Sequence, residues 1–137
     1  MKSFLKRFLN YPVSLLLLCA ILYLSLFKPS VNDSFKLFAN MDKVAHFFMY
    51  AGLSLVMWFE HYRSHDRISY LHVLVMSFFI PVLFSGAMEL MQSGLTDYRT
   101  ADYYDFLFNF AGSLSANVVC FLVIKPFLDK KYKRMSK

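Results

Sequence analysis

The stretch ISYLHVLVMSFFIPVLFSGAMELM, residues 68–91, contains one charged residue, Glu89, in 24 positions. About 20 consecutive apolar residues in a helix are enough to cross the hydrocarbon core of a bilayer, which is about 30 Å thick. The stretch therefore predicts a membrane-spanning helix. Pro81 lies within it and predicts a bend, because proline cannot donate the backbone hydrogen bond expected at its position. Packing or water should satisfy the carbonyl that is left unbonded.

Three further apolar runs lie on either side of this stretch, at residues 8–27, 44–59 and 104–124. The first is interpreted as a retained helix, with Asn10 as its cap and Pro12 in its first turn, because no small-x-small cleavage pattern follows it. The second is short for a span. We expect an all-α membrane fold, a four-transmembrane-helix bundle with helices at about 8–27, 43–60, 68–92 and 104–124. Residues 1–124 form its single domain, and residues 125–137 form a basic cytoplasmic tail.

Composition and charge support the same fold class. The 137 residues are 58% hydrophobic and 19% aromatic, which exceeds the apolar share of a typical soluble domain. With the N-terminus inside, eleven Lys and Arg residues fall on the cytoplasmic side and four on the other, namely Lys28, Lys36, Lys43 and Arg99. This bias predicts that both termini lie inside a multi-pass protein of the cytoplasmic (inner) membrane. The net charge of +6 is therefore attributed to topology, and we expect no nucleic-acid partner.

Polar residues recur at helical spacing near the outer ends of three predicted helices. Positions four apart share one face of a helix, as do positions three apart. The second and fourth helices start at the outer face of the membrane, and the third helix ends there. The topology therefore brings these side chains to the same depth in the membrane. Ionisable residues within a membrane are costly and are functional candidates by default. The predicted binding residues are Asp42, Lys43, His46, Tyr50, Glu89, Gln92, Arg99, Asp105 and Asn109.

Each of these residues also has a structural interpretation. Asp42 could cap a helix, and Glu89 could bond to Arg99 and so tie the outer loop to the bundle. Gly86, Gly112, Ala116 and Ser85 are interpreted as small packing residues that let helices approach closely. The other histidines, His61, His65 and His72, fall on the cytoplasmic side and look incidental.

The ordered set Asp42-Lys43-x-x-His46-x-x-x-Tyr50, Glu89-x-x-Gln92, Arg99 and Asp105-x-x-x-Asn109-x-x-Gly112 resembles the pattern of VanZ-like proteins. The resemblance covers residues 42–112 in order and spacing. Ala116 departs from it, because members often carry a second glycine there, and this puts only the helix spacing in doubt. The resemblance implies an envelope-associated membrane protein. The namesake of the family is associated with resistance to teicoplanin-type glycopeptides, whereas no reaction is implied.

Three functions stay open from the sequence. In the first, the outer cluster binds an anionic lipid, a lipid-linked precursor or a glycopeptide through Arg99 and Lys43. In the second, the protein is an enzyme acting on a lipid headgroup, with His46 as a general base that Asp42 or Glu89 orients and with Arg99 holding the phosphate. In the third, the cluster is a structural latch between helices. The catalytic candidates are His46, Glu89 and Asp105.

The sequence leads us to expect neither a metal nor another cofactor. His46, Glu89 and Asp105 are a conceivable ligand set, but they supply a single imidazole. Membrane lipids are the expected partners, and the oligomeric state is left open.

Overall fold

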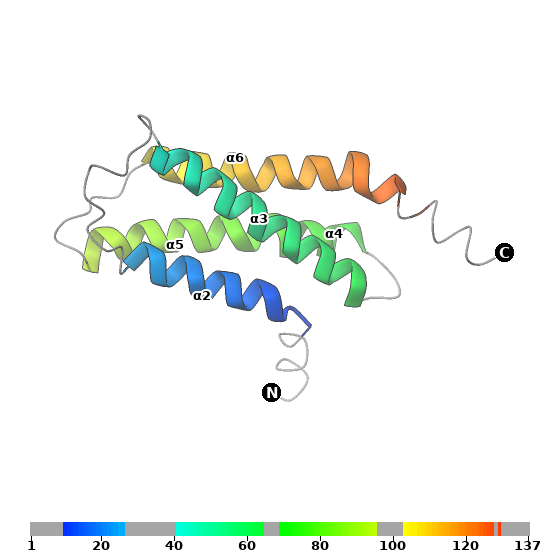
Figure 1. Cartoon of the computed structure of the whole chain (residues 1–137), viewed down its shortest axis with the longest axis horizontal. Helices are drawn as coiled ribbons and strands as arrows, with labels where there is room; N and C mark the ends of the chain where they lie inside the picture. Colours follow the sequence, from blue (N-terminus) through cyan, green and yellow to red (C-terminus); the bar gives the residue numbers. More distant parts are fainter. Residues whose placement is uncertain (1–9, 27–40, 65–68, 96–102, 128, 130–137) are drawn as a thin grey trace.

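The computed structural model describes residues 10–26, 41–64, 69–95, 103–127 and 129, and the described residues contain helices and no strand. Two of the long helices contain a π-helical segment, labelled η, that continues the α-helix without a break. The chain thus forms four helical rods (Figure 1). Their elements are α2 (Pro12–Leu26), α3 (Met41–Ser64), α4 (Tyr70–Leu74) with η2 (Val75–Phe79) and α5 (Ile80–Leu95), and α6 (Tyr103–Val119) with η3 (Cys120–Ile124).

The two ends of the bundle differ in which helices begin there. At one end, which we call the His46 end, α3 and α6 begin while α2 and α5 finish, and Gln92 Nε2 donates to the carbonyl of Ser25 at 3.2 Å. At the other, the His61 end, the hydroxyl of Tyr11 lies 2.5 Å from Nδ1 of His61. The first and last described residues both lie at the His61 end, as four antiparallel rods require (Figure 1).

Helix α3 is the central rod of the bundle. Its buried residues recur every three or four positions along most of its length, from His46 to His61. That face packs against α2, η2 and, most extensively, α6. Gly112 of α6 marks a close approach to α3, because a Cβ atom placed there would lie 2.2 Å from the carbonyl oxygen of Phe47. Glycine at this position therefore lets the two backbones meet.

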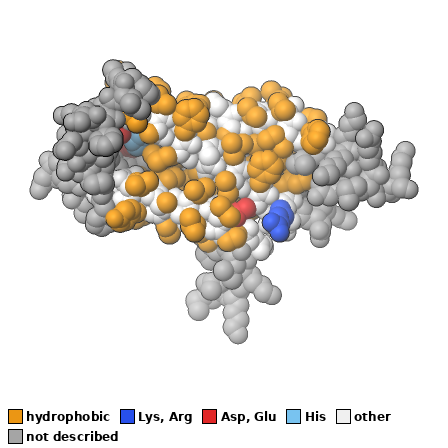
Figure 2. Space-filling model, viewed as in Figure 1, with side chains coloured by type: hydrophobic (Ala, Val, Ile, Leu, Met, Phe, Trp, Pro, Cys, Tyr) orange, Lys and Arg blue, Asp and Glu red, His pale blue; other side chains and the backbone are white. Residues whose placement is uncertain are grey.

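The distribution of polarity across the bundle is inverted relative to a soluble protein. Thirteen polar residues are buried among the described residues, against ten hydrophobic ones. Large apolar side chains face outward instead, and Leu83, Leu90 and Leu122 are each more than 70% exposed. Figure 2 shows hydrophobic side chains covering the helices, with few charged side chains among them. A lipid environment solvates such a surface, whereas water does not.

Two of the rods are long and apolar enough to cross a membrane, at Tyr70–Gly94 and Tyr103–Phe127. Only 28% and 33% of their most apolar stretches are buried inside the chain, so these helices are not the covered core of a soluble domain. α2 is apolar but has 15 residues, and α3 is long but more polar. The all-α class and the four helices are confirmed. The four-span topology and its orientation stay predictions.

The carbonyl that Pro81 leaves without its usual donor is hydrogen-bonded by a neighbouring helix, whereas the bend at Pro81 stays a prediction. The π-helical segment η2 ends at Phe79, two residues before the proline. In a regular α-helix the missing N–H of Pro81 would have bonded to the carbonyl of Ser77. That carbonyl accepts a hydrogen bond from Nδ2 of Asn117 at 3.0 Å instead. Asn117 of α6 thereby supplies the donor that Pro81 lacks.

The N-terminus of α2 is capped from α3 and not by Asn10. The first-turn N–H groups of Val13 and Ser14 donate to the two carboxylate oxygens of Glu60, at 2.8 and 3.0 Å. The hydroxyl of Ser14 donates to the same carboxylate at 2.5 Å. A carboxylate at this position satisfies donors that a helix leaves unbonded, and its charge complements the helix dipole. This contact fixes α2 to the far end of α3.

Candidate functional site

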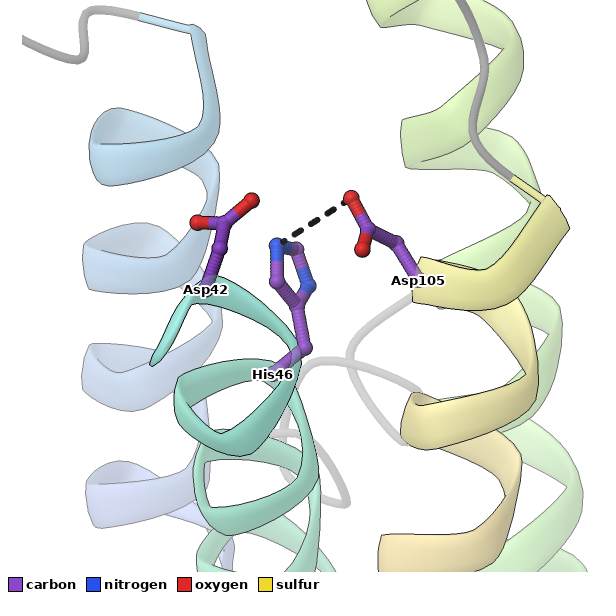
Figure 3. Close-up of side chains that lie close together, drawn as sticks. All are labelled: Asp42, His46 and Asp105. Carbon is purple, nitrogen blue, oxygen red and sulfur yellow. Dashed lines mark ion pairs between the residues drawn. The ribbon is translucent and has the colours of Figure 1, made fainter. Parts of the chain in front are cut away.

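Three ionisable side chains converge at the His46 end. Asp42 and His46 lie one turn apart on α3, and Asp105 lies in the first turn of α6 (Figure 3). The first turn of a helix favours a carboxylate, because its N–H groups carry partial positive charge. The local sequence thus places both acids at helix N-termini, and the packing of α3 on α6 makes them flank one imidazole.

The distances between side chains in this cluster are longer than those of hydrogen bonds. His46 Nε2 lies 3.8 Å from Oδ2 of Asp105, and Lys43 Nζ lies 3.7 Å from Oδ1 of the same carboxylate. His46 and Asp105 are buried, at 5% and 6% exposure, whereas Asp42 is exposed. The cluster therefore extends from the surface of the bundle into its interior.

A chain of hydrogen bonds begins at Nδ1 of His46, on the side of the ring away from the carboxylates. Its Nδ1 lies 3.2 Å from Oδ1 of Asn109, whose Nδ2 donates to Oγ of Ser85 at 2.8 Å. Ser85 in turn lies beside the hydroxyl of Tyr50. Because the amide presents its oxygen to Nδ1, that nitrogen carries the proton and donates. His46 Nε2 is therefore the ring nitrogen that faces the carboxylates, and its lone pair is available there when it carries no proton.

The carboxylate of Asp105 has fewer hydrogen bonds than a buried carboxylate normally accepts. Its Oδ1 is buried and has no hydrogen-bond partner among the described residues. Its two cationic or ring-nitrogen contacts, to Lys43 and His46, both exceed hydrogen-bonding distance. Buried carboxylates normally accept several hydrogen bonds, and an unmet acceptor of this kind lowers the stability of the fold.

Lys43 lies at the rim of the cluster. Its side chain is 23% exposed, and its ammonium lies 5.6 Å from the centroid of the Tyr104 ring. This arrangement is a cation–π contact, which leaves the ammonium within reach of both Asp105 and the surface.

Of the other predicted site residues, some lie near the cluster at the His46 end and one lies outside the described residues. Glu89 and Gln92 are buried near the end of α5, so they lie at the predicted end of the bundle. Gln92 bonds to α2 through Ser25. Arg99 lies outside the described residues, and so does the predicted pair of Glu89 with Arg99. Asn109 contacts Nδ1 of His46, while the orienting role that the enzyme interpretation gives to Asp42 or Glu89 stays a prediction.

Several polar contacts could not be identified from the sequence. Ser85 was interpreted as a packing residue, yet its hydroxyl accepts a hydrogen bond from Asn109. His61 looked incidental, yet it is buried and contacts Tyr11. A serine or histidine in an apolar run carries no signal of its partner when that partner is tens of residues away.

The cluster also has the donor set of a metal site. One ligand atom from each of Asp42, His46 and Asp105 lies within 4.8 Å of the others. The set considered from the sequence contained Glu89 in place of Asp42. The helical spacing of four between Asp42 and His46 is the signal that could have identified it.

The fold and this polar end define an all-helical protein with membrane-spanning character. The sequence matches the profile of the VanZ/LLP1 family over residues 7–124, and the chain belongs to that family. This confirms the resemblance drawn from the polar residues. Membership and the two apolar helices together indicate a membrane protein.

One similar relative is an uncharacterized protein of the fission yeast Schizosaccharomyces pombe, which is 37% identical over 90 residues. The match covers 65% of this chain and 52% of the relative, so the chain spans about half the length of the protein it matches. No solved structure matches the chain.

Proposed function

We propose that the chain crosses the cytoplasmic membrane four times, with the His46 end on the extracytoplasmic side. The excess of Lys and Arg near the predicted cytoplasmic ends of the helices supports this orientation. The polarity of α3 is compatible with a span, because His46, Ser54 and His61 are buried against other helices.

Labelling in intact cells tests the orientation. In a variant without Cys19 and Cys120, a cysteine at Arg99 should react with a membrane-impermeant maleimide. A cysteine at Arg67 should react only after the cells are permeabilised. The reverse pattern would place the His46 end in the cytoplasm.

We further propose that this end binds the phosphate-bearing headgroup of a lipid. The observation that carries the proposal is the buried Oδ1 of Asp105, which has no hydrogen-bond partner among the described residues. If the cluster only joined helices, its carboxylate would be expected to accept hydrogen bonds from them, because a buried acceptor without one lowers stability by about 1–3 kcal/mol. A binding site accounts for this loss of stability, because a donor group of the ligand would then bond to Asp105.

The mixed charge of the cluster suits such a headgroup. Lys43 can bind a phosphate oxygen through a charge-assisted hydrogen bond, while Asp105 accepts from a hydroxyl or amine of the same headgroup. Similarity to a yeast protein favours a ligand that membranes of many kinds contain. The VanZ namesake is associated with teicoplanin resistance. A lipid-linked precursor of the envelope is therefore a second candidate ligand, and it also carries a phosphate group.

Lipid retention by the purified protein tests this function. Native mass spectrometry in the presence of EDTA should show phosphatidylglycerol retained over phosphatidylcholine, whose headgroup lacks donors. Lys43→Gln should reduce the preference about tenfold, as the loss of one charge-assisted hydrogen bond predicts. Lys125→Gln is the matched control, because Lys125 pairs with Asp129 at the His61 end at 3.2 Å.

The same experiment separates the two sources of phosphate. Preferential retention of a polyprenyl diphosphate would assign the site to lipid-linked precursors, and preferential retention of phosphatidylglycerol would assign it to phospholipids. Equal retention of all lipids by the wild type and by Lys43→Gln would disprove headgroup binding.

A further inference from the structure

We propose that Asp42, His46 and Asp105 form a three-ligand site for a divalent transition-metal ion, with Zn²⁺ as the ion that fits best. The first observation is the convergence of the donors. Two carboxylate oxygens and one imidazole nitrogen from α3 and α6 lie within 4.8 Å of one another. In Figure 3 the two carboxylates flank the imidazole ring of His46.

The second observation is independent of that spacing. Asp105 is 6% exposed, and its Oδ1 has no hydrogen-bond partner among the described residues. Its Oδ2 is 3.8 Å from His46 Nε2, which is too far for a hydrogen bond. A divalent cation between these groups would compensate the buried carboxylate.

The third observation concerns the imidazole itself. Asn109 accepts from Nδ1 of His46 at 3.2 Å, so Nε2 is the ring nitrogen that faces the two carboxylates and can bind a metal ion when it carries no proton. Metal-binding histidines are held in this way, with the second ring nitrogen bonded to a fixed acceptor that sets the tautomer. Asn109 is in turn fixed by its bond to Ser85 at 2.8 Å. The ring is therefore already oriented for a metal ion.

The donor types select the ion. Mg²⁺ and Ca²⁺ prefer oxygen ligands, whereas an imidazole with carboxylates suits Zn²⁺. Zinc bonds of about 2.0–2.2 Å require the donor atoms to draw together. Asp42 is the exposed member of the set and lies at the start of α3. Three protein ligands leave a further coordination position open.

Lys43 gives the proposal a distinctive signature. Its ammonium lies 3.7 Å from Oδ1 of Asp105, so it competes with a metal ion for that carboxylate. Removing this charge should tighten metal binding, while removing a ligand should weaken it. A variant that is merely less stable does not bind the ion more tightly. The inference stands apart from lipid binding, because it is tested with the metal alone.

The experiment uses the full chain, without an affinity tag, purified in detergent and treated with EDTA. Isothermal titration with Zn²⁺ should show one site, and His46→Gln and Asp105→Asn should each weaken it by about tenfold or more. Lys43→Gln should bind more tightly than the wild type. His72→Gln is the matched control, because His72 is exposed on α4 and should leave the affinity unchanged.

Co²⁺ provides a second readout that does not depend on the ligand variants. The bound ion should give the visible absorption of a low-coordinate nitrogen and oxygen site, and Zn²⁺ should displace it. If His46→Gln does not fold, the comparison of Lys43→Gln with the wild type decides the question. Binding that is equal in the wild type, Asp105→Asn and Lys43→Gln would overturn the proposal, as would the absence of any binding by the wild type.

Discussion

The imidazole of His46 is held by Asn109, across the interface of α3 and α6, with Nδ1 and Oδ1 3.2 Å apart. The two residues are 63 positions apart in the sequence. On the other side of the ring, the carboxylate of Asp105 lies 3.8 Å away. One side of His46 is thus hydrogen-bonded and the other only loosely paired. This asymmetry suggests that Asn109 and Asp105 contribute to the protein in opposite ways.

Substitutions at Asn109 and Asp105 should therefore change stability in opposite directions. Asn109→Leu leaves His46 Nδ1 and Ser85 without their partner and should lower the free energy of unfolding by about 1–3 kcal/mol. Asp105→Asn removes a buried charge whose Oδ1 is unbonded, so its melting temperature should equal or exceed that of the wild type. Thermal unfolding in detergent measures both. Equal losses in the two variants would favour the structural latch.

A methyl group at Gly112 should disrupt the packing of α3 on α6. The added Cβ would lie 2.2 Å from the carbonyl oxygen of Phe47, and neither backbone can move alone to relieve the overlap. We expect Gly112→Ala to lower stability by about 1–3 kcal/mol or more, as overpacking in a tight interface does. The measurement is the melting temperature of the purified protein.

Gly52→Ala is the control for this variant. Gly52 lies within α3, and a Cβ there would meet nothing within 4 Å. Alanine is favoured over glycine in a helix by about 0.8–1 kcal/mol, so Gly52→Ala should be neutral or stabilising. A similar loss in both variants would mean that the close approach at Gly112 is not the cause.

The apolar runs were sufficient to predict the helices but not all of their ends. The second helix is expected to end at about residue 60, whereas α3 continues to Ser64. Glu60 and His61 lie beyond the apolar run, which stops at Phe59. They are accommodated because α2 provides their partners, the N–H groups of its first turn and the hydroxyl of Tyr11. A partner on another helix is not visible in a local pattern.

The candidate site could be predicted as far as helical spacing determines it. A spacing of four placed Asp42 with His46, and Asp105 with Asn109, and the structure brings all four to one end. The pairing across helices could not be predicted, because it depends on which faces of α3 and α6 meet. Ser85 shows this limit well, since nothing in its sequence neighbourhood distinguishes a packing serine from one that bonds to Asn109.

Asn117 and Pro81 should be energetically coupled. Asn117→Ala removes the donor to the carbonyl of Ser77, which the proline leaves without its usual partner, so the loss should be about 1–3 kcal/mol. In a Pro81→Ala background the helix supplies its own N–H, and the same substitution should cost less. A double-mutant cycle on unfolding free energies measures the difference. Additive effects would show that the two residues act separately.

Glu60 should control the attachment of α2 to the bundle. Its carboxylate accepts from Val13, from the backbone of Ser14 and from the hydroxyl of Ser14. Glu60→Gln keeps the shape but replaces one acceptor with a donor and removes the charge at the helix N-terminus. Hydrogen exchange should therefore quicken at the first turn of α2 and remain unchanged in α6. Glu60→Asp, which keeps the charge on a shorter side chain, should have a smaller effect. Slower or unchanged exchange at Val13 and Ser14 in Glu60→Gln would show that α2 is held by its apolar contacts with α3 alone, since the cap would then contribute nothing to its attachment.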